Sequence, residues 1–103
     1  MTRFVLAYTG GSVPESPAEQ QAVMDAWTGW FGALGGAVVD GGAPFGLSST
    51  IAGDGPAIDG GASALTGYSI VEAPDLAAAV EMGRGCPILA GGGSVEVYET
   101  MAM

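Results

Sequence analysis

Residues 67–99, GYSIVEAPDLAAAVEMGRGCPILAGGGSVEVYE, contain two strand patterns with a helix pattern between them. The run Gly67–Glu72 starts at a glycine and is rich in β-forming residues, which predicts a strand. Asp75–Gly83 predicts a short helix, because apolar residues recur on one helical face and an acid occupies the first turn. Ser94–Glu99 alternates apolar and polar residues, which predicts a second strand. This half of the chain is therefore a β-α-β unit.

The preceding half of the chain has the same order of patterns. Arg3–Thr9 is an apolar run that predicts a strand, and Ala37–Asp40 predicts a shorter one. Between them, Ser16-Pro17-Ala18-Glu19 is a capping box with proline at the first helical position. The helix that follows carries an apolar stripe of Val23, Ala26, Trp27, Trp30, Phe31 and Leu34. We expect Trp27 and Phe31 to be core residues rather than a platform for a ligand.

Two β-α-β units in one chain predict a ferredoxin-like α+β fold of order β-α-β-β-α-β. In this fold a four-stranded antiparallel sheet carries two helices on one face. The 103 residues match the size of one domain, so we expect a single domain over residues 1–103. Residues 42–66 are the least informative part: residues 53–61 predict an exposed loop, and Leu47–Ile51 predicts a further strand in a hairpin.

Both faces of the first strand are apolar. Phe4, Leu6 and Tyr8 alternate with Val5 and Ala7 along the strand, so the two sets point to opposite sides of the sheet. Only 13% of the residues are charged, about half of the usual ~25%. Because the helices cover one sheet face only, we expect the other face to pack against a second copy of the chain in a homodimer.

The charge balance excludes several kinds of partner. The formal net charge is −9, and Arg3 and Arg84 are the only cations. Nucleic-acid binding needs several Lys or Arg residues to displace counterions from the phosphates, and anionic membranes repel the chain for the same reason. There is no apolar run of transmembrane length, the start does not resemble a signal peptide, and Cys86 has no second cysteine to pair with. These features predict a cytoplasmic protein that binds neither nucleic acid nor membrane.

The pattern of residues 67–99 resembles the YCII-related family, in its DGPF-type branch. The residues that carry the resemblance are Gly67–Ala73, Asp75–Leu76, Ala78–Ala79, Gly85–Pro87 and Gly92–Glu99. A looser match covers the strand ending at Tyr8, the Trp-bearing helix and Val38–Gly41, and Asp54-Gly55-Pro56 echoes the naming motif with Ala57 in place of Phe. The resemblance implies a dimeric α+β barrel with a cavity between two sheets, and no settled function. Some relatives carry a His-Asp pair, which this chain cannot have because it contains no histidine.

The composition also limits the chemistry. Ser-His-Asp and Cys-His sites need an imidazole, and Schiff-base and P-loop sites need a lysine, yet the chain has neither residue. A single cysteine cannot build a zinc site, and no calcium-type aspartate loop is present. We therefore expect no metal and no cofactor. Cys86 is interpreted as a structural thiol, and Arg84 as a solvated cation near a helix end.

Carboxylates and tyrosines are the remaining polar candidates for a site. Asp40 is either a turn aspartate or a general base at the mouth of the barrel. Glu96 is either a solvated residue or a carboxylate that faces the dimer cavity. Tyr8 and Tyr68 are either packing residues or hydroxyls that orient a ligand. We expect any ligand site to lie near Tyr8, Asp40, Tyr68 and Glu96.

Two classes of function fit these residues. The first is a small-molecule-binding or interaction module without conventional catalytic residues, which the absence of His and Lys favours. The second is a cofactor-free lyase or isomerase that acts on a small organic substrate through carboxylate and tyrosine groups. Either class would suit an apolar cavity with a few polar groups.

Overall fold

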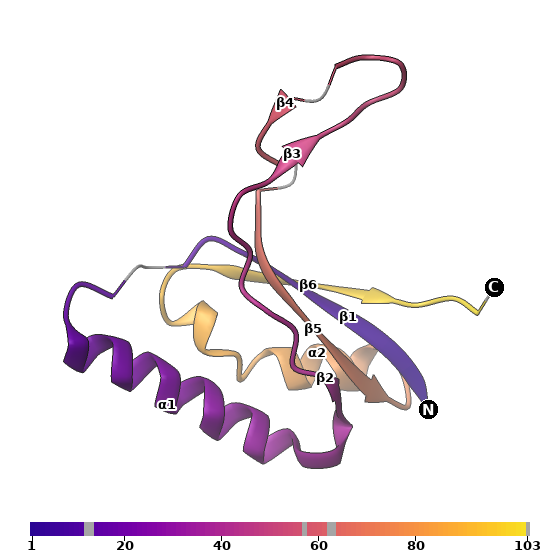
Figure 1. The fold of residues 1–103 in the computed structure, drawn as a ribbon. Helices are drawn as coiled ribbons and strands as arrows, with labels where there is room; N and C mark the ends of the chain where they lie inside the picture. The colour runs from indigo at the N-terminus through magenta and orange to yellow at the C-terminus, as the bar shows by residue number, and fades with distance from the viewer. Residues whose placement is uncertain (12–13, 57, 62–63, 103) are drawn as a thin grey trace.

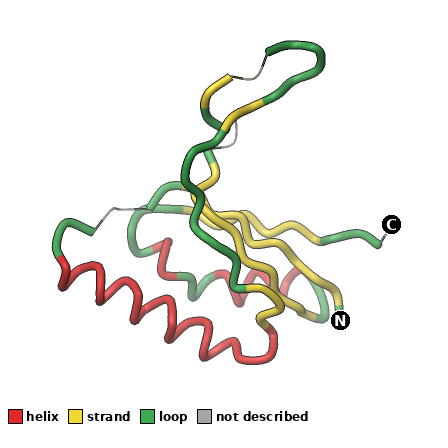
Figure 2. Tube along the Cα trace, viewed as in Figure 1, coloured by secondary structure: helices red, strands yellow, loops and turns green. Residues whose placement is uncertain are grey.

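The computed structural model describes residues 1–11, 14–56, 58–61 and 64–102. It is an α+β fold with a four-stranded antiparallel sheet and two helices, as predicted, and it is consistent with a ferredoxin-like fold (Figures 1 and 2). The elements in chain order are β1 (Thr2–Thr9), α1 (Pro17–Leu34), η1 (Gly35–Ala37), β2 (Val38–Asp40), β3 (Ser49–Thr50), β4 (Ile58–Asp59), β5 (Leu65–Ala73), α2 (Leu76–Gly83), η2 (Pro87–Leu89) and β6 (Ser94–Glu99). The main sheet has the strand order β2-β5-β1-β6. Ala57, part of the predicted loop and of the DGPF-like motif, lies outside the described residues.

Strand β1 is central, and its register with β5 and β6 decides which side chains share a face. Phe4 lies opposite Val71, and Leu6 lies between Ser69 and Val97. These residues face the helices, where the core cluster also contains Trp30 of α1 and Ala79 of α2. Phe4, Leu6, Val71 and Ala79 have no exposed surface. The core therefore lies between one face of the sheet and the two helices.

Local signals in the sequence account for the start and end of α1. Ser16 adopts an extended conformation, and its side chain accepts a hydrogen bond of 3.1 Å from the Glu19 amide. The Glu19 carboxylate accepts in turn from the amide of Glu15, at 2.8 Å. The helix ends at Leu34, and its C-cap residue Gly35 has a positive φ of 56°, which suits glycine.

The apolar stripe of α1 is buried over only part of its length. Trp30 is 8% exposed and its indole nitrogen donates to the Met82 carbonyl oxygen at 3.0 Å. Trp27 and Phe31 pack against the core cluster but are only partly buried, and Val23 is 41% exposed. Trp27 and Phe31 thus belong to the core as expected, whereas Val23 and Ala26 of the same stripe are exposed, because the buried part of the core reaches α1 at Trp30 and does not extend to the helix start.

Residues 45–56 and 58–61 belong to an arm that projects from the rest of the molecule (Figure 1). Within it, β3 and β4 pair antiparallel as a separate two-stranded sheet, and β3 lies inside the predicted range Leu47–Ile51. Leu47 and Ile51 are exposed. At the base of the arm, Phe45 stacks on Tyr68 with ring centroids 5.9 Å apart.

The burial of Phe4 predicts a large stability difference between two matched substitutions. Phe4→Ala should lower the free energy of unfolding by about 3–5 kcal/mol, because it leaves a cavity beneath the helices. Phe45→Ala should cost about 1 kcal/mol or less, since Phe45 is 44% exposed on the arm. Chemical denaturation followed by tryptophan fluorescence measures both values. Equal losses would show that the core has been assigned to the wrong face of β1.

Candidate functional site

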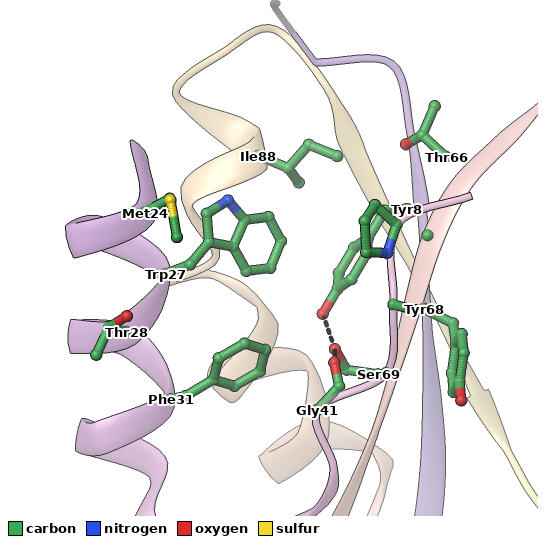
Figure 3. A pocket seen from close by; sticks show the side chains of 14 residues that line it. Tyr8, Met24, Trp27, Thr28, Phe31, Gly41, Thr66, Tyr68, Ser69 and Ile88 are labelled. Atoms are coloured by element: carbon green, nitrogen blue, oxygen red, sulfur yellow. Dashed lines mark hydrogen bonds between the residues drawn. The ribbon is translucent and has the colours of Figure 1, made fainter. Parts of the chain in front are cut away.

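A cleft of about 440 Å³ opens between α1, the segment Gly41–Pro44 and strand β5 (Figure 3). Tyr8 of β1 and Gly67, Tyr68 and Ser69 of β5 line its sheet side. This volume lies within the usual range of ~300–1,000 Å³ for small-molecule sites. The cleft is therefore large enough to hold a drug-sized molecule.

Helix α1 supplies the aromatic wall of the cleft. Its lining residues are Met24, Trp27, Thr28 and Phe31. Their spacing of three, one and three residues places them on one helical face. The Trp27 ring meets the Tyr8 ring edge to face, with centroids 5.3 Å apart, and lies 5.8 Å from the Phe31 ring. The wall is thus a continuous aromatic surface that joins the helix to the sheet.

The segment Gly41–Pro44 forms the opposite wall, and its position depends on glycine. Gly42 has a φ of 75°, and a Cβ atom there would lie 1.8 Å from the Tyr68 carbonyl oxygen. The Gly42 amide donates to Asp40 Oδ1 at 2.8 Å, which closes the turn that follows β2. Only glycine allows the chain to pass this close to β5.

A directed chain of hydrogen bonds lies on the sheet side of the cleft. Tyr8 Oη donates to Ser69 Oγ at 2.8 Å, and Ser69 Oγ donates to the Gly41 carbonyl oxygen at 2.7 Å. A carbonyl oxygen can only accept, so both proton positions are determined. Ser69 has no exposed surface, and this chain satisfies its buried hydroxyl.

Tyr8 and Cys86 are the ionisable side chains beside these hydrogen bonds, and both are in their neutral forms. Burial raises the pKa of Tyr8 well above its ordinary value of 10, although the hydrogen bond to Ser69 opposes the shift. Burial likewise raises the pKa of the Cys86 thiol from 9.0. At neutral pH, Tyr8 is therefore not a phenolate base and Cys86 is not a thiolate nucleophile.

The four residues predicted for the site do not share one face of the sheet. Tyr8 points toward the helices with Phe4 and Leu6, whereas Asp40, Tyr68 and Glu96 belong to the opposite face, here called the open face. The expectation that all four come together is wrong for Tyr8, because neighbouring residues of a strand point to opposite sides. Tyr68 borders the cleft, but its ring points away from it (Figure 3).

The other three predicted residues belong to the open face, with Tyr68 and Glu96 in one row across the strands and Asp40 in the neighbouring row, opposite Ile70. Tyr68 Oη donates to Asp40 Oδ2 at 3.0 Å, and this bond raises the pKa of Tyr68 above 10.0. Ala7 lies directly between Tyr68 on β5 and Glu96 on β6. Asp40 and Tyr68 are therefore in contact, while two strand spacings of ~5 Å each separate Tyr68 from Glu96.

Sequence reasoning did not identify Ser69 or the segment Gly41–Pro44 as parts of a site. Ser69 carries a weak signal, since it shares a strand face with the apolar Val71. Its partners Tyr8 and Gly41 are 61 and 28 residues away along the chain, which no local pattern reveals. Trp27 and Phe31 were recognised, but as core residues only.

The cleft is electrically neutral, since none of its lining residues is Asp, Glu, Lys or Arg. Over the part of the chain that the structure describes, no group of three or more His, Cys, Asp or Glu residues could hold a metal ion. Within those same residues, no helix is long and apolar enough to cross a membrane.

The raised pKa of Tyr8 predicts a loss of stability at alkaline pH. The unfolded chain ionises its tyrosines near pH 10 while the folded chain keeps Tyr8 protonated, so stability falls as the pH rises above 10. The free energy of unfolding of the wild type should fall by about 1 kcal/mol more than that of Tyr8→Phe between pH 9 and 11. Tyr98→Phe, on the exposed open face, is the matched control and should follow the wild type more closely. If the free energy of unfolding of Tyr8→Phe and of the wild type fell by the same amount, the raised pKa of Tyr8 would be contradicted.

Comparison of the chain with models of protein families, with curated proteins and with solved structures gives no match. The resemblance to the YCII-related family therefore stays a prediction from the motif residues.

Proposed function

We propose that the chain is a YCII-like domain that binds a small molecule in the cleft beside α1. The observation that carries this proposal is the neutral cleft of about 440 Å³, with one aromatic wall and one hydrogen-bonded polar edge. Sites for small molecules commonly combine a largely apolar lining with a few polar groups that orient the ligand. The YCII-like assignment is supported by the matching residues in 67–99 and by the antiparallel sheet with two helices.

Binding is favoured over catalysis by the chemical state of the groups near the cleft. A lyase or isomerase needs a group that exchanges protons near neutral pH. The raised pKa values of Tyr8 and Cys86 place both groups outside that range. Glu96 belongs to the open face, and the Asp40 carboxylate is engaged by the Gly42 amide and the Tyr68 hydroxyl and does not line the cleft.

The domain is also proposed to form a homodimer through the open face. Its central rows consist of Ile70, Val5 and Tyr98, followed by Tyr68, Ala7 and Glu96. Tyr98 is 53% exposed, and within the described residues no helix packs on this face (Figure 1). Packing against a second copy would remove this apolar surface from water and create a second, shared cavity.

Binding in the cleft can be tested with Nile red, a neutral dye whose fluorescence rises in apolar sites. We expect one saturable site per chain, weakened about fivefold or more by Phe31→Ala, because the aromatic wall loses a ring. Phe45→Ala removes an exposed ring outside the cleft and should leave the affinity unchanged. If Phe45→Ala weakens binding as much as Phe31→Ala, the dye is not in the cleft.

The proposed dimer predicts a light-scattering mass of twice one chain at micromolar concentration. Val5→Lys places a charge on the open face and should give a folded monomer, since two buried ammonium groups would meet. Val23→Lys is the matched control, because Val23 is on the exposed part of α1. A monomeric wild type, or a dimer that survives Val5→Lys, would rule out this interface.

A further inference from the structure

We propose that the cleft selects planar aromatic molecules that donate a hydrogen bond and carry no negative charge, such as phenols and indoles. This inference rests on the proposed binding function and adds the chemical class of the ligand. It follows from three properties of the lining: the direction of its hydrogen bonds, its aromatic wall and the absence of a cationic group.

The polar edge of the cleft consists of Tyr8, Ser69 and the Gly41 carbonyl, and its internal hydrogen bonds leave it only acceptor lone pairs to offer a ligand. The Gly41 carbonyl oxygen accepts a hydrogen bond from Ser69, and Ser69 accepts one from Tyr8. Both hydroxyl protons are therefore already donated within the protein. The lone pairs that remain on Tyr8 Oη and Ser69 Oγ can only accept. The Gly42 amide is also used, as it donates to Asp40. A ligand that donates an O–H or N–H to this edge therefore complements it, whereas a ligand carbonyl does not.

The aromatic wall sets the shape of the ligand. Trp27 and Phe31 lie across the cleft from the Tyr8 hydroxyl, and the indole nitrogen of Trp27 points away from that hydroxyl (Figure 3). Because the Trp27 and Tyr8 rings are already in contact, a flat ring would lie beside this pair and against Phe31, with its donor directed at Tyr8 Oη. Stacked and edge-to-face aromatic contacts favour such a ring over an aliphatic molecule of equal size.

The distribution of charge excludes anions. The chain has two cationic side chains and a net charge of −9. Arg3 is paired with Glu72 at 3.6 Å and Arg84 with Glu81 at 2.8 Å, and neither arginine lines the cleft. A carboxylate ligand would lose its hydration without gaining a counter-charge.

The experiment compares indole, 1-methylindole and indole-3-carboxylate on the full chain. Affinities come from isothermal titration calorimetry, and the binding site from amide shifts of Gly41, Gly42 and Thr66 in NMR spectra. The preference is the dissociation constant of 1-methylindole divided by that of indole. One hydrogen bond should make this preference about fivefold in the wild type, with no detectable binding of indole-3-carboxylate.

The double variant Tyr8→Phe with Ser69→Ala removes both accepting hydroxyls. Neither hydroxyl is left without its partner in this variant, and Gly41, whose carbonyl oxygen loses the bond from Ser69, is exposed to water, so the variant should remain folded. Its preference should fall to about one, whereas Tyr98→Phe on the open face should keep the wild-type preference.

The possible outcomes separate the two proposals. Equal wild-type affinities for indole and 1-methylindole, tight binding of indole-3-carboxylate, or an unchanged preference in the double variant would overturn the selectivity while leaving a binding cleft. Failure of Nile red and of both indoles to bind would overturn the proposed function as well. If the double variant does not fold, the wild-type comparison and the location of the amide shifts decide the question.

Discussion

The alternation of side chains along β1 is the constraint on which the rest of the structure depends. The strand lies between β5 and β6, so its residues from Phe4 to Thr9 have a neighbour on both sides. Phe4, Leu6 and Tyr8 form the floor of the helix-side core, while Val5 and Ala7 form the centre of the open face. A shift of register by one residue would exchange the two sets and would remove both the core and the cleft.

The cleft also depends on β1, through Tyr8. Tyr8 is the last core residue of β1, and its hydroxyl reaches beyond the apolar cluster to Ser69. Ser69 in turn holds the carbonyl of Gly41, which begins the wall opposite α1. The close passage of Gly42 against Tyr68 fixes the same wall from the other side. Core packing and the geometry of the cleft therefore share residues, so a substitution in one affects the other.

The sequence predicts the local features of this molecule better than those that depend on contacts between distant segments. Alternation within Arg3–Thr9 and the capping box at Ser16 are local, and they correctly indicated a strand and the start of α1. The division of Tyr8 and Tyr68 between two faces depends on how β1 pairs with β5, which no single segment contains. The apolar stripe of α1 showed that Trp27 and Phe31 face the protein interior, but not that a cleft remains beside them. The sequence did not indicate Ser69 as a site residue, because its role depends on hydrogen bonds to Tyr8 and Gly41, which are distant from it along the chain.

The absence of histidine has a consequence for how the charge of this protein responds to its surroundings. The side chains that could titrate above neutral pH, Tyr8, Tyr68, Tyr98 and Cys86, all have raised pKa values. Apart from the amino terminus, no group of the chain has an ordinary pKa between those of the carboxylates and those of the thiol and phenols. The protein is thus a poor proton buffer around neutrality, and its charge stays near −9 over that range. Among the side chains, therefore, none with an ordinary pKa would make binding depend on physiological changes in pH, and such a dependence would point to the amino terminus or to the ionisation of the bound molecule.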